Sequence, residues 1–181
     1  MTMVRAERYD SVAIALHWAI ALLILANIGI AWSLGSFDRH SPMHDQVLTM
    51  HKSVGTTVLL LAVLRLLWRW SHPAPPLPAF VPNWQRRAAL AGHALLYAMM
   101  FVMPTSGLLD SAAFSETVHY FFLVDIPPFM GHDEHFGHAA FAVHKLTALL
   151  LYALLLAHAG AALFHHYVRK DDVLRRMLPG R

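Results

Sequence analysis

Four long apolar stretches constrain this chain more than any other feature of its sequence. They predict helices over about 11–35, 47–70, 87–110 and 138–168, each longer than the roughly 20 residues needed to cross a bilayer. The chain is 57% hydrophobic and only 14% charged, which is typical of membrane proteins. Because backbone in lipid must satisfy its own hydrogen bonds, these stretches predict an all-α, integral membrane four-helix bundle. We expect residues 1–181 to form this single transmembrane domain.

Arginine and lysine are distributed unequally between the two sides of such a bundle. The side with both termini and the middle linker carries most of them, including Arg86, Arg87, Arg169 and Arg176. Most carboxylates fall on the other side. The positive-inside rule therefore predicts that both termini lie in the cytoplasm, an N-in/C-in topology. This bias accounts for the net charge of +3, which gives no indication of nucleic-acid binding.

Histidines recur at two matched depths in three of the four stretches. His144 and His158 lie fourteen residues apart, nearly four helical turns, so they leave one face about 21 Å apart along the axis. An isolated imidazole is costly in lipid, whereas imidazole is a common axial ligand of haem iron. We expect His17 and His158 to bind the iron of an inner haem. We expect His51 and His144 to bind the iron of an outer haem, so that two haems stack across the membrane.

The absence of cysteine limits how such haems are held. Thioether attachment, thiolate-bound iron–sulfur clusters and disulfides are all excluded. The predicted cofactors are therefore two non-covalent haem groups, each with bis-histidine ligation. Two alternatives remain for the four histidines. They are isolated hydrogen-bonded polar residues in a helix interior, or they serve a metal-ion channel or transporter without haem.

Other polar residues lie close to these depths. Arg65 follows His51 by fourteen residues, so it shares that face at the depth of the inner pair. It is a candidate partner for an inner haem propionate, because arginine binds carboxylates in bidentate fashion; the alternative is that it reaches the inner headgroups. His93 opens the third stretch at inner depth, where a structural or quinone-contacting role is favoured over ligation. Lys52 and Lys145 directly follow the outer ligands, and either meet outer propionates or extend to the interface.

Several segments, in this order, resemble the bacterial cytochrome b561 family of small four-helix di-haem membrane proteins. They are SVAIALHW in the first stretch, MHKSVG and VLRLLWRWSHPAPPLP in the second, GHALLYAMMFVMPTSGLL in the third, and HKLTALLLYALLLAHAGAALFHHYVRKDDVLRRMLP in the fourth. The resemblance covers nearly the whole chain. Its ligand positions match the four histidines that membrane depth selects.

The resemblance implies haem b and electron exchange with membrane quinone in the bacterial cytoplasmic (inner) membrane. In some members the implied reaction oxidises superoxide on the outer side and reduces ubiquinone, which is the leading interpretation for this chain. The runner-up is a cytochrome b relay subunit that takes electrons from a dehydrogenase or hydrogenase, with a redox protein as donor. The sequence assigns no residue a catalytic role.

Overall fold

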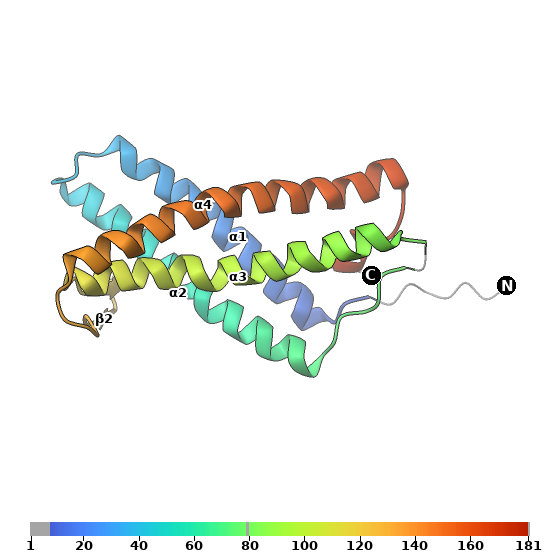
Figure 1. The fold of residues 1–181 in the computed structure, drawn as a ribbon, viewed down its shortest axis with the longest axis horizontal. Helices are drawn as coiled ribbons and strands as arrows, with labels where there is room; N and C mark the ends of the chain where they lie inside the picture. Colours follow the sequence, from blue (N-terminus) through green and yellow to red (C-terminus); the bar gives the residue numbers. More distant parts are fainter. Residues whose placement is uncertain (1–7, 79, 181) are drawn as a thin grey trace.

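Four long helices dominate the computed structural model, which describes residues 8–78 and 80–180 (Figure 1). They are α1 (Ser11–Ser33), α2 (Pro42–Ser71), α3 (Asn83–Ala113) and α4 (Glu134–Leu163). Each lies in a candidate membrane span by its length and apolar composition. This confirms the predicted all-α architecture of four long apolar helices. The predicted domain of residues 1–181 also includes residues 1–7, 79 and 181, which lie outside the described part.

Side-chain caps mark the starts of three of the long helices, α1, α2 and α4. The carboxylate of Asp10 accepts a hydrogen bond from the Ala13 amide at 2.9 Å and caps α1. The Ser41 hydroxyl caps α2, with Pro42 at the first helical position. As a result α2 begins five residues before the expected 47. Helix α3 has no side-chain cap and begins directly after Pro82, four residues before the expected 87. The expected bounds followed hydropathy, so they omitted polar first turns that extend past the apolar layer.

The bundle has a narrow core and an apolar exterior. Ile20, Ile24, Val58 and Leu151 form the buried cluster at its centre, and several partly buried methionines of α3 pack around it. Many other long apolar side chains point outwards; Leu156, for example, is 76% exposed. A water-soluble protein rarely exposes apolar side chains over such an area. The exterior therefore has the character of a lipid-facing surface.

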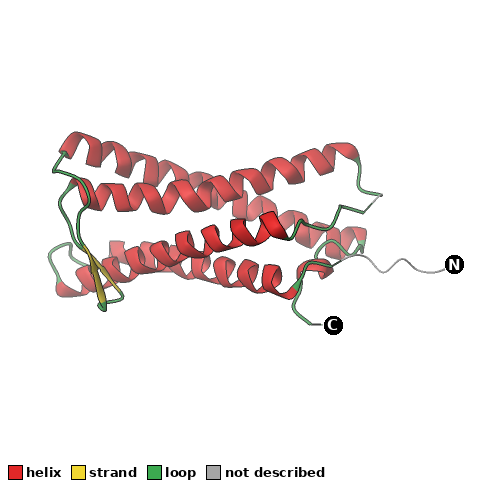
Figure 2. Ribbon diagram, turned by 90° about the horizontal axis from the view of Figure 1, so that it is seen from below, coloured by secondary structure: helices red, strands yellow, loops and turns green. Residues whose placement is uncertain are grey.

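A short β-hairpin lies at one end of the bundle (Figure 2), where its first strand packs against α2. Strand β1 (Val118–Tyr120) pairs antiparallel with β2 (Val124–Ile126). The amide of Phe121 donates to the Ser53 hydroxyl oxygen at 2.8 Å, which ties the hairpin turn to α2. We call this end of the bundle the hairpin end.

The N-terminal and C-terminal segments meet at the opposite end, here called the terminal end. After α4 the chain continues as a π-helix (η2, Phe164–Arg169), and two short 3-10 turns also occur (η1, Leu34–Ser36; η3, Arg175–Met177). The Trp18 indole N–H donates to the Met177 carbonyl at 2.8 Å, and the Arg8 guanidinium donates to the Leu178 carbonyl at 2.6 Å. These contacts place the two segments side by side.

Candidate functional site

Two pairs of imidazole rings face each other inside the bundle. Near the terminal end, His17 of α1 faces His158 of α4, with ring centroids 6.1 Å apart and an interplanar angle of 68°. Nearer the hairpin end, His51 of α2 faces His144 of α4, also at 6.1 Å, with an angle of 87°. We call these the terminal-level and hairpin-level pairs. The structure thus brings together the same two pairs that membrane depth selects in the sequence.

The ring separation fits one metal ion held between each pair. A metal–imidazole nitrogen bond is about 2 Å and the ring centre lies roughly 1 Å beyond the nitrogen, so two imidazoles on one ion have centres about 6 Å apart. Both pairs have this separation. Since both α4 histidines belong to one continuous helix, the two levels lie about 21 Å apart along its axis.

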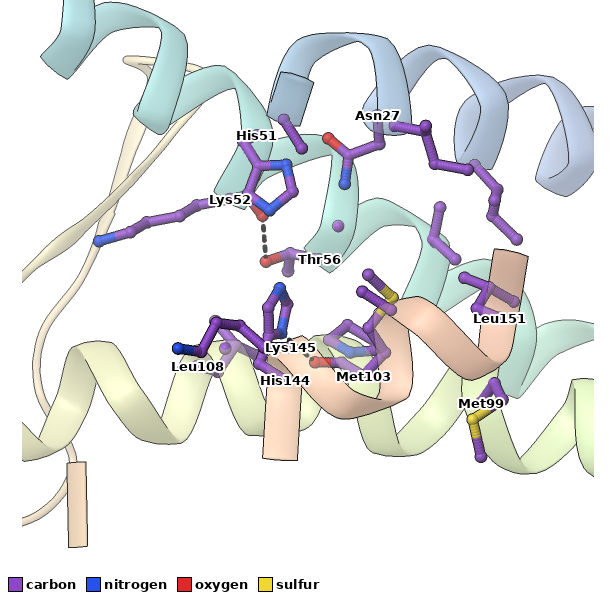
Figure 3. A pocket seen from close by; sticks show the side chains of 18 of the residues that line it. Asn27, His51, Lys52, Thr56, Met99, Met103, Leu108, His144, Lys145 and Leu151 are labelled. Carbon is purple, nitrogen blue, oxygen red and sulfur yellow. Dashed lines mark hydrogen bonds between the residues drawn. The ribbon is translucent and has the colours of Figure 1, made fainter. Parts of the chain in front are cut away.

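Helix α3 fixes the orientation of the His144 ring (Figure 3). Nδ1 of His144 lies 2.8 Å from the carbonyl oxygen of Met103, and a carbonyl only accepts hydrogen bonds. The proton of the neutral ring is therefore on Nδ1, which leaves Nε2 with a free lone pair. A Cβ at Gly107 would lie 3.2 Å from ring atoms of His144, so this glycine gives the ring its space. Metal-binding histidines commonly donate their other ring N–H to a backbone carbonyl in this way.

A cavity of about 360 Å³ surrounds the hairpin-level pair. All four helices contribute to its walls, which include His51, His144, Asn27 of α1 and Gly55 of α2. Five buried side-chain polar atoms of the described residues have no hydrogen-bond partner, and two of them, His51 Nδ1 and Asn27 Oδ1, belong to residues that line this cavity. Buried polar atoms normally have partners, so Asn27 Oδ1 is an acceptor in the cavity wall that a polar group of a bound ligand would satisfy. An apolar cavity with a few polar atoms and opposed imidazoles fits a haem.

A third imidazole lies at the terminal level. The ring of His93, from α3, is centred 5.4 Å from that of His158, which is closer than His17 is. The three rings come from three different helices. The hairpin level, in contrast, has two facing rings among the described residues. The position of His93 in the third apolar stretch predicts the membrane depth of the inner pair, but it gives no reason to place this ring against His158.

Arg65 lies at the terminal level as its spacing predicts. Its Nε donates to the Tyr97 hydroxyl at 3.1 Å, and its Nη1 donates to the Ala13 carbonyl at 3.4 Å. The guanidinium also lies 5.9 Å from the centre of the Tyr97 ring. These contacts hold the charge between α1, α2 and α3 rather than at the lipid surface. The predicted contact between Arg65 and a haem propionate stays a prediction.

Sequence reasoning missed two features of the site. Asn27 is, with His17, one of the few strongly polar side chains inside the first apolar stretch, and that signal would have found it. The Met103 carbonyl carries no side-chain signal, because any residue supplies a backbone oxygen. Its position next to Pro104 is the nearest available hint, since a proline inside a helix disturbs the local backbone hydrogen bonding.

The fold and the site together define a class: a four-helix membrane protein with opposed imidazole pairs at two depths. Comparison with known proteins identifies the family. The chain belongs to the prokaryotic cytochrome b561 family, whose profile matches residues 8–180. It is therefore a membrane haem cytochrome of the b type that functions in transmembrane electron transport.

Named relatives cover almost the full length of the chain. It is 32% identical to cytochrome b561 homolog 2 of Escherichia coli K12 over 173 residues, which are 95% of this chain and 92% of the relative. It is 33% identical to cytochrome b561 homolog 1 of the same organism over 176 residues, 97% and 99% of the two chains. It is 30% identical to the probable superoxide oxidase CybB of Yersinia pestis over 179 residues, 96% and 97% of the two chains.

Proposed function

We propose that this protein moves electrons across the bacterial cytoplasmic membrane from superoxide on the outer side to ubiquinone, through two b haems. The observation that carries the proposal is the two facing imidazole pairs, each with one ring from α4, at two levels about 21 Å apart. A bis-histidine haem b supplies reversible one-electron chemistry at each level. His17 and His158 hold the terminal-level haem, and His51 and His144 hold the hairpin-level haem.

The basic residues at the terminal end support a topology with both termini in the cytoplasm. The hairpin level then lies near the outer surface, where the donor arrives. Arg65 provides the fixed positive charge for a propionate at the terminal level, since its Tyr97 and Ala13 contacts leave part of the guanidinium fork for a carboxylate. The Met103 carbonyl keeps the proton on His144 Nδ1, so Nε2 remains available to iron.

The electron balance of the proposed reaction is simple. Each superoxide loses one electron and leaves as dioxygen. Two such electrons and two protons convert ubiquinone to ubiquinol. The superoxide step is supported by the Yersinia pestis relative, which is described as a probable superoxide oxidase.

The test is stopped-flow absorbance of the purified, oxidised protein mixed with superoxide. We expect the haem bands to shift to the reduced form in milliseconds, and added ubiquinone to reoxidise them. Haems that stay oxidised under superoxide, yet are reduced by dithionite, would overturn the superoxide step.

A relay subunit for a dehydrogenase or hydrogenase is the second candidate. It is favoured by the charge at the hairpin end, where Glu116 forms a 2.6 Å ion pair with Lys52 and so neutralises a cation beside His51. A protein donor with a basic surface would suit this end better than a small anion. Copurification of a soluble redox protein that reduces the haems, with no reduction by superoxide, would favour the relay.

A further inference from the structure

The side chain of Lys52 is held away from the hairpin-level imidazoles. Lys52 follows His51 directly and lines the cavity between His51 and His144. Its Nζ nevertheless lies 2.6 Å from Oε2 of Glu116, in the segment between α3 and the hairpin. Figure 3 shows the ammonium pointing away from the two rings. Glu116 therefore determines where this cation lies.

Two further charged side chains line the same cavity. Lys145 follows His144, and its ammonium lies 4.9 Å from the centre of the Phe141 ring. Asp110 of α3 also lines the cavity, within electrostatic reach of both Lys52 and Glu116. This group of four residues, Lys52, Lys145, Asp110 and Glu116, carries two positive and two negative formal charges. It thus contributes no net charge at the hairpin end of the cavity.

We infer that Glu116 is a specificity-determining residue: it restrains Lys52 and leaves this entrance without a charge preference, so that the entrance admits superoxide but does not select small anions over other electron donors. An entrance that selects anions needs an excess of positive charge near the opening. Here Glu116 neutralises Lys52 at contact distance. The formal charge of Asp110 balances that of Lys145 in the lining of the same cavity. Loss of the Glu116 charge frees Lys52 and leaves an excess of one positive charge. The inference rests on the proposed function only in taking the hairpin level as the point of electron entry.

The expected effect follows from Coulomb's law. One unit charge at roughly 8 Å from the path of a monovalent donor in water changes its local concentration about two- to threefold. The effect has opposite sign for anionic and cationic donors. It disappears at about 1 M salt, where the screening length is about 3 Å.

The experiment compares Glu116→Gln with the wild-type holoprotein by stopped-flow haem reduction at about 10 mM and 1 M salt. The donors are superoxide, the sulfur dioxide radical anion from dithionite, and hexaammineruthenium(II) as a cation. Glu116→Gln should react about two- to threefold faster with both monovalent anions and about four- to ninefold slower with the divalent cation, at low salt only. The midpoint potential of one haem, the hairpin-level haem, should also rise.

The matched control is Glu134→Gln, which removes the same charge from the first turn of α4, ten residues before His144. It should change the rates less than Glu116→Gln does. The exchange of both partners, Lys52→Glu with Glu116→Lys, restores the pair and should return all three rates to near wild type. This double variant keeps the inference testable if Glu116→Gln is poorly folded.

The outcomes separate this inference from the proposed function. If superoxide reduces the wild type but Glu116→Gln matches the Glu134→Gln control with every donor, the inference is wrong and the function stands. If superoxide does not react with the wild type, while the dithionite radical and the ruthenium cation change in opposite directions in Glu116→Gln, the superoxide function is wrong and the inference stands. If Glu116→Gln raised the rate of haem reduction by the cation as much as the rates with the anions, the charge argument would be overturned.

Discussion

Gly107→Ala is expected to weaken haem binding at the hairpin level selectively. The new methyl group would lie 3.2 Å from both Cε1 and Nδ1 of His144, a few tenths of an ångström inside ordinary contact. The ring cannot retreat freely, because its Nδ1 donates to the Met103 carbonyl at 2.8 Å. Perturbing the groups that hold a metal-binding histidine in its orientation typically costs 10–100-fold in affinity. We therefore expect a loss of about 1.4–2.8 kcal/mol in the binding free energy of one haem.

The assay is haem titration of the apoprotein together with a potentiometric titration of the holoprotein. The control is Gly29→Ala, where a Cβ would have no described atom within 4 Å. Alanine is about 1 kcal/mol better than glycine in a helix, so neither variant should suffer from helix propensity. We expect one of the two haems to be lost or shifted in Gly107→Ala and both to be unchanged in Gly29→Ala. Equal behaviour of the two variants would refute the reasoning about the His144 ring.

Three other predictions follow from neighbouring contacts. Arg65→Leu should shift the midpoint potential of the terminal-level haem more than that of the hairpin-level haem; equal shifts in a redox titration would contradict a propionate contact. His93→Ala should keep two haems by pyridine haemochrome assay, since His17 and His158 already face each other; loss of a haem would make His93 a ligand. Asp10→Ala should lower the unfolding free energy by about 1 kcal/mol, seen as a lower Tm in detergent, whereas Asp10→Asn should retain most of it.

The Asp10 prediction also has a pH dependence. Desolvation by its surroundings raises the pKa of this carboxyl, but hydrogen bonds from the Ala13 amide and the Trp68 indole outweigh it and leave the pKa below its usual range. A carboxyl with a lowered pKa in the folded state stabilises the protein above its unfolded-state pKa of about 3.9. That contribution is lost as the pH falls through the folded-state pKa. The Tm difference between wild type and Asp10→Ala should therefore shrink below about pH 4.

The parts of this structure that sequence could predict are those with strong periodic signals. Four apolar stretches predict four helices, because length and composition alone decide whether a segment can span a bilayer. Position along a straight helix gives the depth of a residue in the membrane. Equal depth therefore predicts that His17 pairs with His158 and that His51 pairs with His144. The same arithmetic put Arg65 at the terminal level.

The parts that sequence could not predict depend on folding between segments. The β-hairpin has Phe121 and Phe122 at positive φ in its turn, where the usual signal is asparagine or glycine. Its attachment to α2 through Ser53 is a tertiary contact without a local signature. The Lys52–Glu116 pair spans 64 residues. It gives Lys52 a partner that neither interpretation from the sequence, an outer propionate or the interface, included.

Haem content in His158→Ala and His144→Ala tests the central claim most directly. Each purified, folded variant is assayed for haem per chain and titrated potentiometrically. The account predicts one haem in each, with the higher-potential centre missing from one variant and the lower-potential centre missing from the other. Both haems retained, or both lost from a folded protein, in either variant would contradict two independent histidine pairs.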